Sequence, residues 1–478
     1  MAVVVYKENA ARFIELAAEE NLKAVCVAEI TDTDRLRMFY KDELIVDIER
    51  NFLDTNGVKQ LQNADIEQGA IKYFEQLDKV TEDYADKGEY GKALKYELAK
   101  LNNCSQKGAG EVFDATIGAA SVLMPFGGKN QLTPAIIMAS KPPVSGFTHT
   151  VTCSSFGISP ELMIESPYTG AIYSIVSAVS KLVASGVDYT TIRLTLQEFF
   201  KRLKKEPSRW GEPLSALLGA FDAQINLKLA AIGGKDSMSG TFENIDVPPT
   251  LIAFAMGIAR DNALINNAFG DSGYIYRFKV QKDEYSRPYY SKLLDMYSAI
   301  SAMIMNGEIK WATVCESSFC VALAKSLIGN GSGAYLERFD KEHFMTATGD
   351  IILITNSLID TPYGSYIGTL NGSGNITAPN ITISVKELTE AFTAMLEPVF
   401  RSTAIADGEV KNISYHTDKI FKAKKTAVPQ VIIPVFPGTN CEYDMAKAFE
   451  RAGARAETFV IRNNSAKDIE QSIMEMKK

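Results

Sequence analysis

The residues best suited to phosphate chemistry lie in one short stretch, AIGGKDSMSG, at positions 231–240. Two glycines there precede Lys235, Asp236 and Ser237. Glycine lets a ligand approach the main chain closely, and consecutive backbone N–H groups can form a concave site for anions. Lysine supplies a positive charge for phosphate, and aspartate is a hard oxygen ligand for Mg²⁺. The stretch is therefore a candidate phosphate and metal site.

Short glycine-rich strings also occur as plain polar turns. Taken alone, the residues favour that simpler interpretation, in which Lys235 and Asp236 pair with each other in solvent. The choice between the two interpretations depends on the rest of the chain.

Histidines are few, and the cysteines follow no recognisable motif. The chain has three histidines, His149, His343 and His416, and none stands in a recognisable catalytic motif. Its six cysteines are scattered without the spacing of a zinc site or a disulfide framework. We therefore expect chemistry that depends on lysine, carboxylates and backbone dipoles, in the reducing cytosol.

Composition excludes several classes of protein. The 478 residues suffice for about three domains, and 46% hydrophobic with 23% charged residues is ordinary for a globular protein. A net charge of −8 argues against a nucleic-acid binder. The sequence has no apolar run long enough for a membrane span and no signal-peptide pattern at its start, so we expect a cytoplasmic protein.

Hydrophobic patterning predicts helices and strands in alternation around the candidate stretch. Helices are predicted at 166–186 and 210–227, and strands at 191–196 and 249–259. A second αβ unit follows, with strands at 274–280 and 350–356, a helix at 291–307 and a turn-rich β-meander at 368–384.

The two ends of the chain have a different character. In the first 48 residues, the residue pattern predicts strands at 2–6, 23–30, 35–40 and 43–48 and a helix at 9–22. Residues 49–110 are polar and predict a helical linker, with helices at 69–80 and 90–101. From residue 428 the pattern is strand, helix, strand, typical of a doubly wound domain but too short to bury a core alone.

Two separated strings resemble one family. GGKDSMSGTFENIDVPPTL is similar to a loop and strand in the second synthetase half of phosphoribosylformylglycinamidine synthase, the amidotransferase of purine biosynthesis. VFPGTNCEYDMAKAFERAGA is similar to the start of its glutaminase domain, and the first 31 residues resemble the end of its first synthetase half. The resemblance implies an α/β protein: α+β synthetase domains of the aminoimidazole ribonucleotide synthetase type, then the start of a doubly wound class I glutaminase domain.

The resemblance also implies an order of domains. The expected parts are a C-terminal remnant of the first synthetase half (1–48), the helical linker (49–110), the N-terminal and C-terminal domains of the second half (111–258 and 259–420), and a truncated glutaminase domain (428–478).

Members of this family convert formylglycinamide ribonucleotide, glutamine and ATP to the amidine, ADP, phosphate and glutamate. The implied mechanism activates the amide oxygen by phosphoryl transfer with ATP and Mg²⁺, and ammonia from the glutaminase domain of the same chain then attacks. Phosphoryl transfer depends chiefly on positioning and charge neutralisation. No nucleic acid or membrane partner is expected.

The resemblance implies roles for five residues. In relatives the loop reaches into the catalytic cleft, so Gly234 would offer its backbone to ATP, and Lys235 or Asp236 would hold phosphate or Mg²⁺. Ser237 would bind the ribonucleotide substrate. Gln197, with Glu198 beside it, lies where relatives have another nucleotide-contacting loop, although the pair could equally start a helix.

The chain departs from the family pattern at both ends. The first N-terminal domain is missing, and with it the family's catalytic histidine and its main ATP and Mg²⁺ ligands. The chain also stops before the cysteine nucleophile of the glutaminase domain. Cys441 is not expected to replace that nucleophile. We therefore expect no catalytic residue within this chain and no activity from it alone. The alternative is a non-catalytic nucleotide- or phosphate-binding scaffold module. A third option, aminoimidazole ribonucleotide or selenophosphate synthetase, is disfavoured by the glutaminase-like segment.

A further departure concerns an auxiliary site. Many relatives hold a non-catalytic ADP and Mg²⁺ with a Glu and an Asn on a helix and an Asp in a turn. Ser177, Lys181 and Glu316 stand nearest those positions here. Exchanging oxygen ligands for a cation disfavours Mg²⁺, so we expect this pocket to be empty or filled by side chains.

Overall fold

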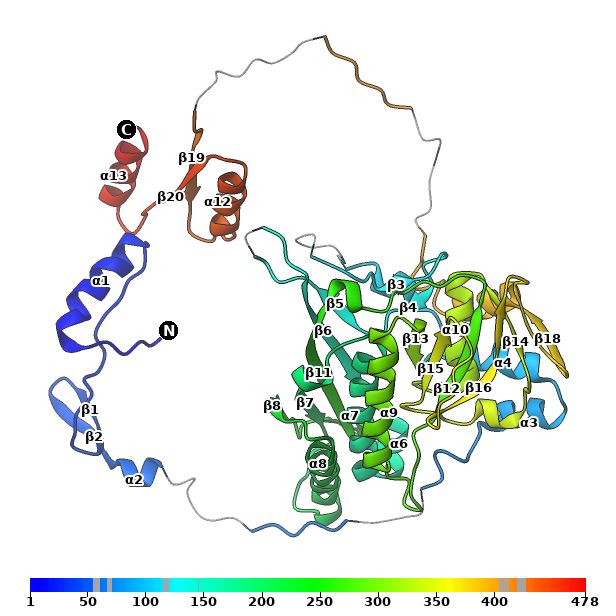
Figure 1. Cartoon of the computed structure of the whole chain (residues 1–478). Helices are drawn as coiled ribbons and strands as arrows, with labels where there is room; N and C mark the ends of the chain where they lie inside the picture. Colours follow the sequence, from blue (N-terminus) through cyan, green and yellow to red (C-terminus); the bar gives the residue numbers. More distant parts are fainter. Residues whose placement is uncertain are drawn as a thin grey trace. The chain divides into compact units, whose positions relative to one another are not determined.

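The computed structural model describes residues 1–54, 61–66, 71–113, 115, 120–144, 146–403, 408, 412–418 and 427–478 (Figure 1). The chain divides into two compact units. The larger unit is Leu61–Asp407, and the smaller combines Met1–Gln60 with Gly408–Lys478. The finer domain boundaries expected from the resemblance stay predictions.

The larger unit contains a five-stranded sheet of order β5-β6-β11-β7-β8. Its strands are β5 (Met138–Ser140), β6 (Thr150–Gly157), β7 (Arg193–Phe199), β8 (Ala231–Lys235) and β11 (Thr250–Arg260). All neighbours are antiparallel except β8, which lies parallel to β7 at the edge. Buried and exposed residues alternate along β6 and β11. One face of the sheet therefore packs on the core, while the other stays open.

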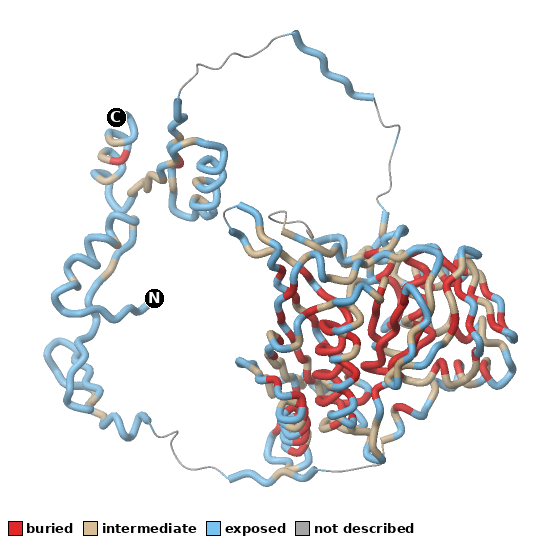
Figure 2. The backbone as a smooth tube through the Cα atoms, viewed as in Figure 1, coloured by how far each residue is buried: buried red, intermediate tan, exposed pale blue. Residues whose placement is uncertain are grey.

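Helix α7 (Pro167–Ala184) fills the core behind this sheet. Ser166 caps its start by accepting from the Thr169 N–H, and Pro167 suits the first helical position. Every residue from Thr169 to Ala184 is buried, as Figure 2 shows in red. Gly157 of β6 permits this packing, because a Cβ there would lie 1.9 Å from the Ser174 carbonyl oxygen. Helix α8 (Pro207–Leu227) packs on the outer side of α7.

A seven-stranded sheet of order β13-β15-β12-β16-β14-β17-β18 forms the second half of the larger unit. Helices α7 and α9 (Tyr290–Met305) pack on one face of this sheet. Three helices pack on the other face: α4 (Tyr90–Ala99), α10 (Phe319–Asn330) and α11 (Val385–Ala394). The strands are β12 (Gly273–Phe278), β13 (Ile309–Val314), β14 (Gly333–Leu336), β15 (Ile351–Thr355), β16 (Gly364–Asn371), β17 (Asn375–Ala378) and β18 (Ile381–Ser384).

The segment expected as a helical linker contributes to this core. Helix α4 buries Ala93, Leu94 and Leu98 completely. The helix predicted at 69–80 is wrong over its described part, because α3 (Lys79–Asp86) begins only after Asp78, whose side chain caps it. The apolar residues before Asp78 instead cover the core, with the Phe74 ring 4.8 Å from that of Tyr173.

The smaller unit has little buried surface. It contains α1 (Ala10–Glu19), the hairpin of β1 (Arg35–Tyr40) and β2 (Glu43–Glu49), α2 (Arg50–Leu53), β19 (Gln430–Val435), α12 (Glu442–Arg451), β20 (Arg455–Val460) and α13 (Ala466–Met476). Strands β19 and β20 are parallel, which confirms the predicted strand, helix, strand pattern. The strands predicted at 2–6 and 23–30 are wrong, because no described segment pairs with them.

Shorter elements complete the described fold. They are η1 (Lys7–Asn9), α5 (Lys107–Gly110), β3 (Phe126–Gly127), β4 (Thr133–Pro134), α6 (Pro160–Glu165), η3 (Tyr189–Thr191), β9 (Thr241–Phe242), β10 (Ile245–Asp246), η4 (Asp261–Ala263) and η5 (Lys341–Phe344). No helix in the described ranges is long and apolar enough to cross a membrane.

Candidate functional site

The candidate stretch begins as an edge strand. Residues Ala231–Lys235 form β8, which pairs in parallel with β7 and is mostly exposed. The glycine pair thus lies in a strand, at the edge of the sheet and outside its core. Gly234 is required by packing, since a Cβ there would lie 2.5 Å from the Leu196 carbonyl oxygen. Gly233 has open space around it.

The chain stays beside β7 after β8 ends. The Ser237 N–H donates to the Glu198 carbonyl oxygen at 3.1 Å, and the Phe200 N–H donates back to the Ser237 carbonyl oxygen at 2.8 Å. The hydroxyls of Ser237 and Ser239 lie 2.9 Å apart. Backbone hydrogen bonds therefore hold the polar stretch against the end of β7.

This pairing brings the five predicted site residues to one edge of the sheet. Gln197 and Lys235 are direct partners in the ladder, so their side chains share a face. Leu194 and Leu196 of β7 pack in the core, so Gln197 points to the open face. Gln197 lies within β7, so the alternative that it starts a helix is wrong.

Lys235 and Asp236 are both exposed. Among the residues that the structure describes, neither side chain has an ion pair or hydrogen bond, and the expected pairing between the two is absent. Both charges are therefore available to a ligand. The assignment of Gly234, Lys235, Asp236, Ser237 and Gln197 to ATP, Mg²⁺ and substrate stays a prediction.

Two carboxylates approach each other at the end of β7. Burial raises the pKa of Glu198, and the nearby charge of Asp236 raises that pKa further. Such a pair is a hard oxygen donor set, and Mg²⁺ commonly binds one or two carboxylates together with substrate phosphates. No group of three or more His, Cys, Asp or Glu residues in the described ranges could hold a metal alone. The donors here fit Mg²⁺ when a phosphate supplies further oxygens.

We expect Glu198→Gln to raise the free energy of unfolding at pH 7. A carboxyl whose pKa is higher in the folded than in the unfolded chain favours folding at low pH and opposes it as pH rises through the folded pKa. The gain should therefore disappear below the unfolded pKa of about 4.3. Urea unfolding of the native chain and the variant between pH 4 and 8 measures this difference in the free energy of unfolding. Glu390→Gln, at an exposed carboxylate, is the control, and a loss of stability at pH 7 in Glu198→Gln would contradict the argument.

An ion pair with a buried lysine involves the residues expected nearest the auxiliary site. The Lys181 side chain is 3% exposed, pairs with Glu316 and donates to the Phe156 carbonyl oxygen at 2.8 Å. Ser177, one turn earlier on α7, is also buried. An ammonium group paired with a single carboxylate does not fit Mg²⁺, which needs several oxygen ligands.

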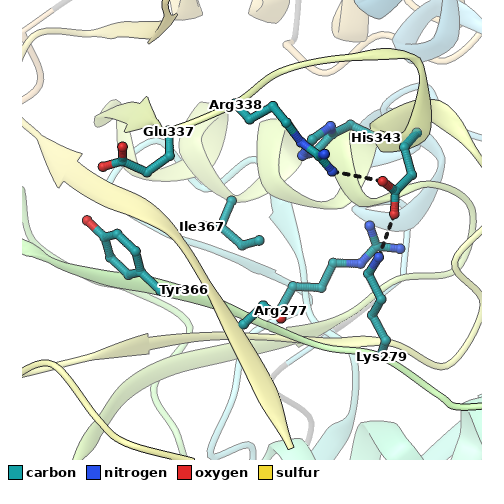
Figure 3. Close-up of a pocket in the computed structure, with 9 residues that line it drawn as sticks. Arg277, Lys279, Glu337, Arg338, His343, Tyr366 and Ile367 are labelled. Atoms are coloured by element: carbon teal, nitrogen blue, oxygen red, sulfur yellow. Dashed lines mark hydrogen bonds and ion pairs between the residues drawn. The ribbon is translucent and has the colours of Figure 1, made fainter.

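A pocket of about 220 Å³ opens beside β12, β16 and η5 (Figure 3). Sequence reasoning did not find it. The three Lys and Arg side chains in its lining are already paired: Arg277 with Asp350, and both Lys279 and Arg338 with Glu342. The pocket is lined by Arg277, Lys279, Glu337, Arg338, Glu342, His343, Ser365, Tyr366 and Ile367. These pairs leave it without a free Lys or Arg charge for an anion.

The fold is the mixed α/β fold of aminoimidazole ribonucleotide synthetase-like proteins. The expected fold class is therefore confirmed. The solved structure of Thermotoga maritima PurL complexed with ATP superposes with a TM-score of 0.52 at 15% identity, over 77% of this chain and 54% of that chain. The structure of the same protein complexed with FGAR superposes with a TM-score of 0.52, over 77% of this chain and 52% of that chain.

Sequence comparison places the chain as a distant relative of phosphoribosylformylglycinamidine synthase subunit PurL. It is 22% identical to the Thermoplasma acidophilum protein over 359 residues, 70% of this chain and 45% of that protein. The Staphylococcus carnosus protein is 22% identical over 81% of this chain and 53% of its own length. Residues 428–476 match the CobB/CobQ-like glutamine amidotransferase domain. The chain spans about half the length of these relatives.

Proposed function

We propose that the chain is part of an ATP-dependent amidotransferase of purine biosynthesis. It would act on formylglycinamide ribonucleotide, with ammonia taken from glutamine, and release the amidine, ADP, phosphate and glutamate. The distant similarity to PurL proteins and the glutamine amidotransferase segment support this proposal. The observation that carries it is the pairing of β7 with β8, which gathers unpaired charges and hydroxyls on one exposed edge.

Each residue at this edge has a role in the proposal. Lys235 neutralises phosphate charge of ATP, and Gln197, on the same face, donates a hydrogen bond to the nucleotide. Asp236 holds Mg²⁺ with help from the Glu198 carboxylate. Ser237 binds the ribonucleotide, and Gly234 lets the backbone of β8 lie close to β7.

In this proposal the residues described here supply binding groups, while the nucleophile and general base of either half of the reaction come from elsewhere. We therefore propose that catalysis requires groups other than the residues named above and that this polypeptide alone is inactive. We also propose that it is located in the cytoplasm. The auxiliary nucleotide position is proposed to be degenerate, because Glu316 pairs with the Lys181 ammonium and is not left free for a metal ion.

Calorimetric titration with MgATP tests the proposal. We expect one equivalent to bind, with affinity about 10- to 100-fold weaker in Lys235→Ala and in Asp236→Ala, because each removes a charge that contacts the ligand. Lys386→Ala and Asp360→Ala remove exposed charges elsewhere and should bind as the native chain does. Unchanged affinity in both site variants would contradict the site, and a second equivalent of nucleotide would contradict the degenerate auxiliary position.

A further inference from the structure

Helix α8 presents an entirely apolar face to solvent. Between residues 210 and 225 every exposed side chain is apolar, with exposed fractions of 36–62%. These six residues, which we name the α8 seam, are Trp210, Leu214, Leu217, Leu218, Phe221 and Ile225. Surface helices normally carry charged and polar residues on the side that faces water.

The opposite side of α8 already has its partner. Small residues, including Gly211, Gly219 and Ala223, are buried there. Gly219 lies so close to the start of α7 that a Cβ on it would be 2.1 Å from the Tyr168 carbonyl oxygen. Figure 1 shows α8 beside α7 at the outside of the larger unit. The helix is therefore apolar on both sides, although only one side packs within the described unit.

The seam is symmetric along the helix. Its members stand at equal distances on either side of a midpoint between Leu217 and Leu218. Two copies of α8 related by a two-fold axis through that midpoint would run antiparallel. Trp210 would then face Ile225 of the second copy, and Leu214 would face Phe221. A two-fold interface requires this kind of self-complementary surface.

The size of the seam also suits a second copy. With roughly 200 Å² for a fully exposed large side chain, the seam offers about 600 Å² per copy. Two copies would bury about 1,200 Å², at the lower end of stable specific interfaces. The seam carries no charge, so an ionic ligand has nothing to bind there.

We propose that the chain forms a homodimer through antiparallel packing of the α8 seam against the same seam of a second copy. The spacing of three and four residues lets the side chains of one helix enter the grooves of the other. This interface is independent of the edge formed by β7 and β8, so either proposal can fail without the other.

Sedimentation equilibrium of the full chain tests the dimer. We expect a mass of twice 52.4 kDa at micromolar concentration. Leu218→Glu should weaken the dimer at least about 100-fold, because it buries a carboxylate at the centre of the interface. Met256→Glu, on the exposed face of the five-stranded sheet, adds the same charge to another apolar surface and should leave the dimer intact. Circular dichroism confirms that each variant is folded.

Two results would overturn the proposal. One is a native chain that stays monomeric at about 100 µM, a concentration far above the expected dissociation constant. The other is a dimer that survives Leu218→Glu but is lost in Met256→Glu, which would place the interface on the sheet.

Cross-linking tests the antiparallel register. In a background where the exposed Cys26 and Cys441 are replaced by serine, Trp210→Cys and Ile225→Cys are prepared separately and treated with a short bismaleimide. We expect cross-linked dimer only when the two variants are mixed. Cross-linking of Trp210→Cys with itself would indicate parallel helices and overturn the register, as would the absence of product from the mixture.

Discussion

Replacing Asp350 by alanine is expected to lower the free energy of unfolding of the larger unit by about 3–5 kcal/mol. The carboxylate is 5% exposed. Its Oδ2 accepts from the Arg277 Nε at 2.9 Å, and its Oδ1 accepts from the Val280 N–H at 2.8 Å. Burial raises the pKa of Asp350 even beside this arginine. Alanine would leave the buried Arg277 guanidinium without a counter-charge.

Guanidinium chloride unfolding, followed by circular dichroism, measures this loss. Asp360→Ala is the matched control, because Asp360 is exposed and has no ion pair among the described residues. We expect the control to change stability by less than about 0.5 kcal/mol. A loss below about 1 kcal/mol in Asp350→Ala would show that the pair contributes far less than its burial indicates.

Stability should respond unequally to the removal of the two partners in the ion pair between Lys181 of α7 and Glu316. Glu316→Ala leaves the Lys181 ammonium, 3% exposed, with the Phe156 carbonyl as its remaining acceptor. We expect a loss of about 2–3 kcal/mol, discounted because the Glu316 side chain is 57% exposed. Lys181→Met leaves a carboxylate that water can solvate, and methionine keeps most of the packing, so its loss should stay below about 1.5 kcal/mol.

The same unfolding measurement compares the two variants. Lys386→Ala, which removes an exposed lysine on α11, controls for loss of one positive charge. Equal losses in Glu316→Ala and Lys181→Met would mean that the buried ammonium is not the costly group, which would weaken the account of the degenerate auxiliary site.

Strongly periodic elements could be predicted from the sequence. The helices α7 and α8 and the hairpin of β1 and β2 lie where apolar spacing places them. Strand β6, TVTCSSFG, could not be found, because the polar Ser155 is buried and the apolar Phe156 is exposed, which breaks the alternation of apolar and polar residues. Strand β8 was concealed by its two glycines, which are depleted in strands and are tolerated here at an exposed edge.

The candidate site shows the same limit. Residue types identified Lys235 and Asp236, but their proximity to Gln197 and Glu198 depends on a strand pairing across almost forty residues of sequence. Because β7 and β8 are parallel, a long crossover that contains α8 joins them, and the residues next to either strand do not show which ones pair. The contact of Lys181 with Glu316 spans a still longer separation and joins helix α7 to the turn that follows β13. Sequence reasoning found each residue there without finding the ion pair.

Hydrogen exchange with and without MgATP tests the central claim, that the edge formed by β7 and β8 binds the nucleotide. We expect slower exchange of backbone amides at 231–240 and at the end of β7 when MgATP is present, because the exposed edge strand gains a partner. Slower exchange confined to the turn around Glu316, or no change at 231–240 at a saturating concentration of MgATP, would contradict it.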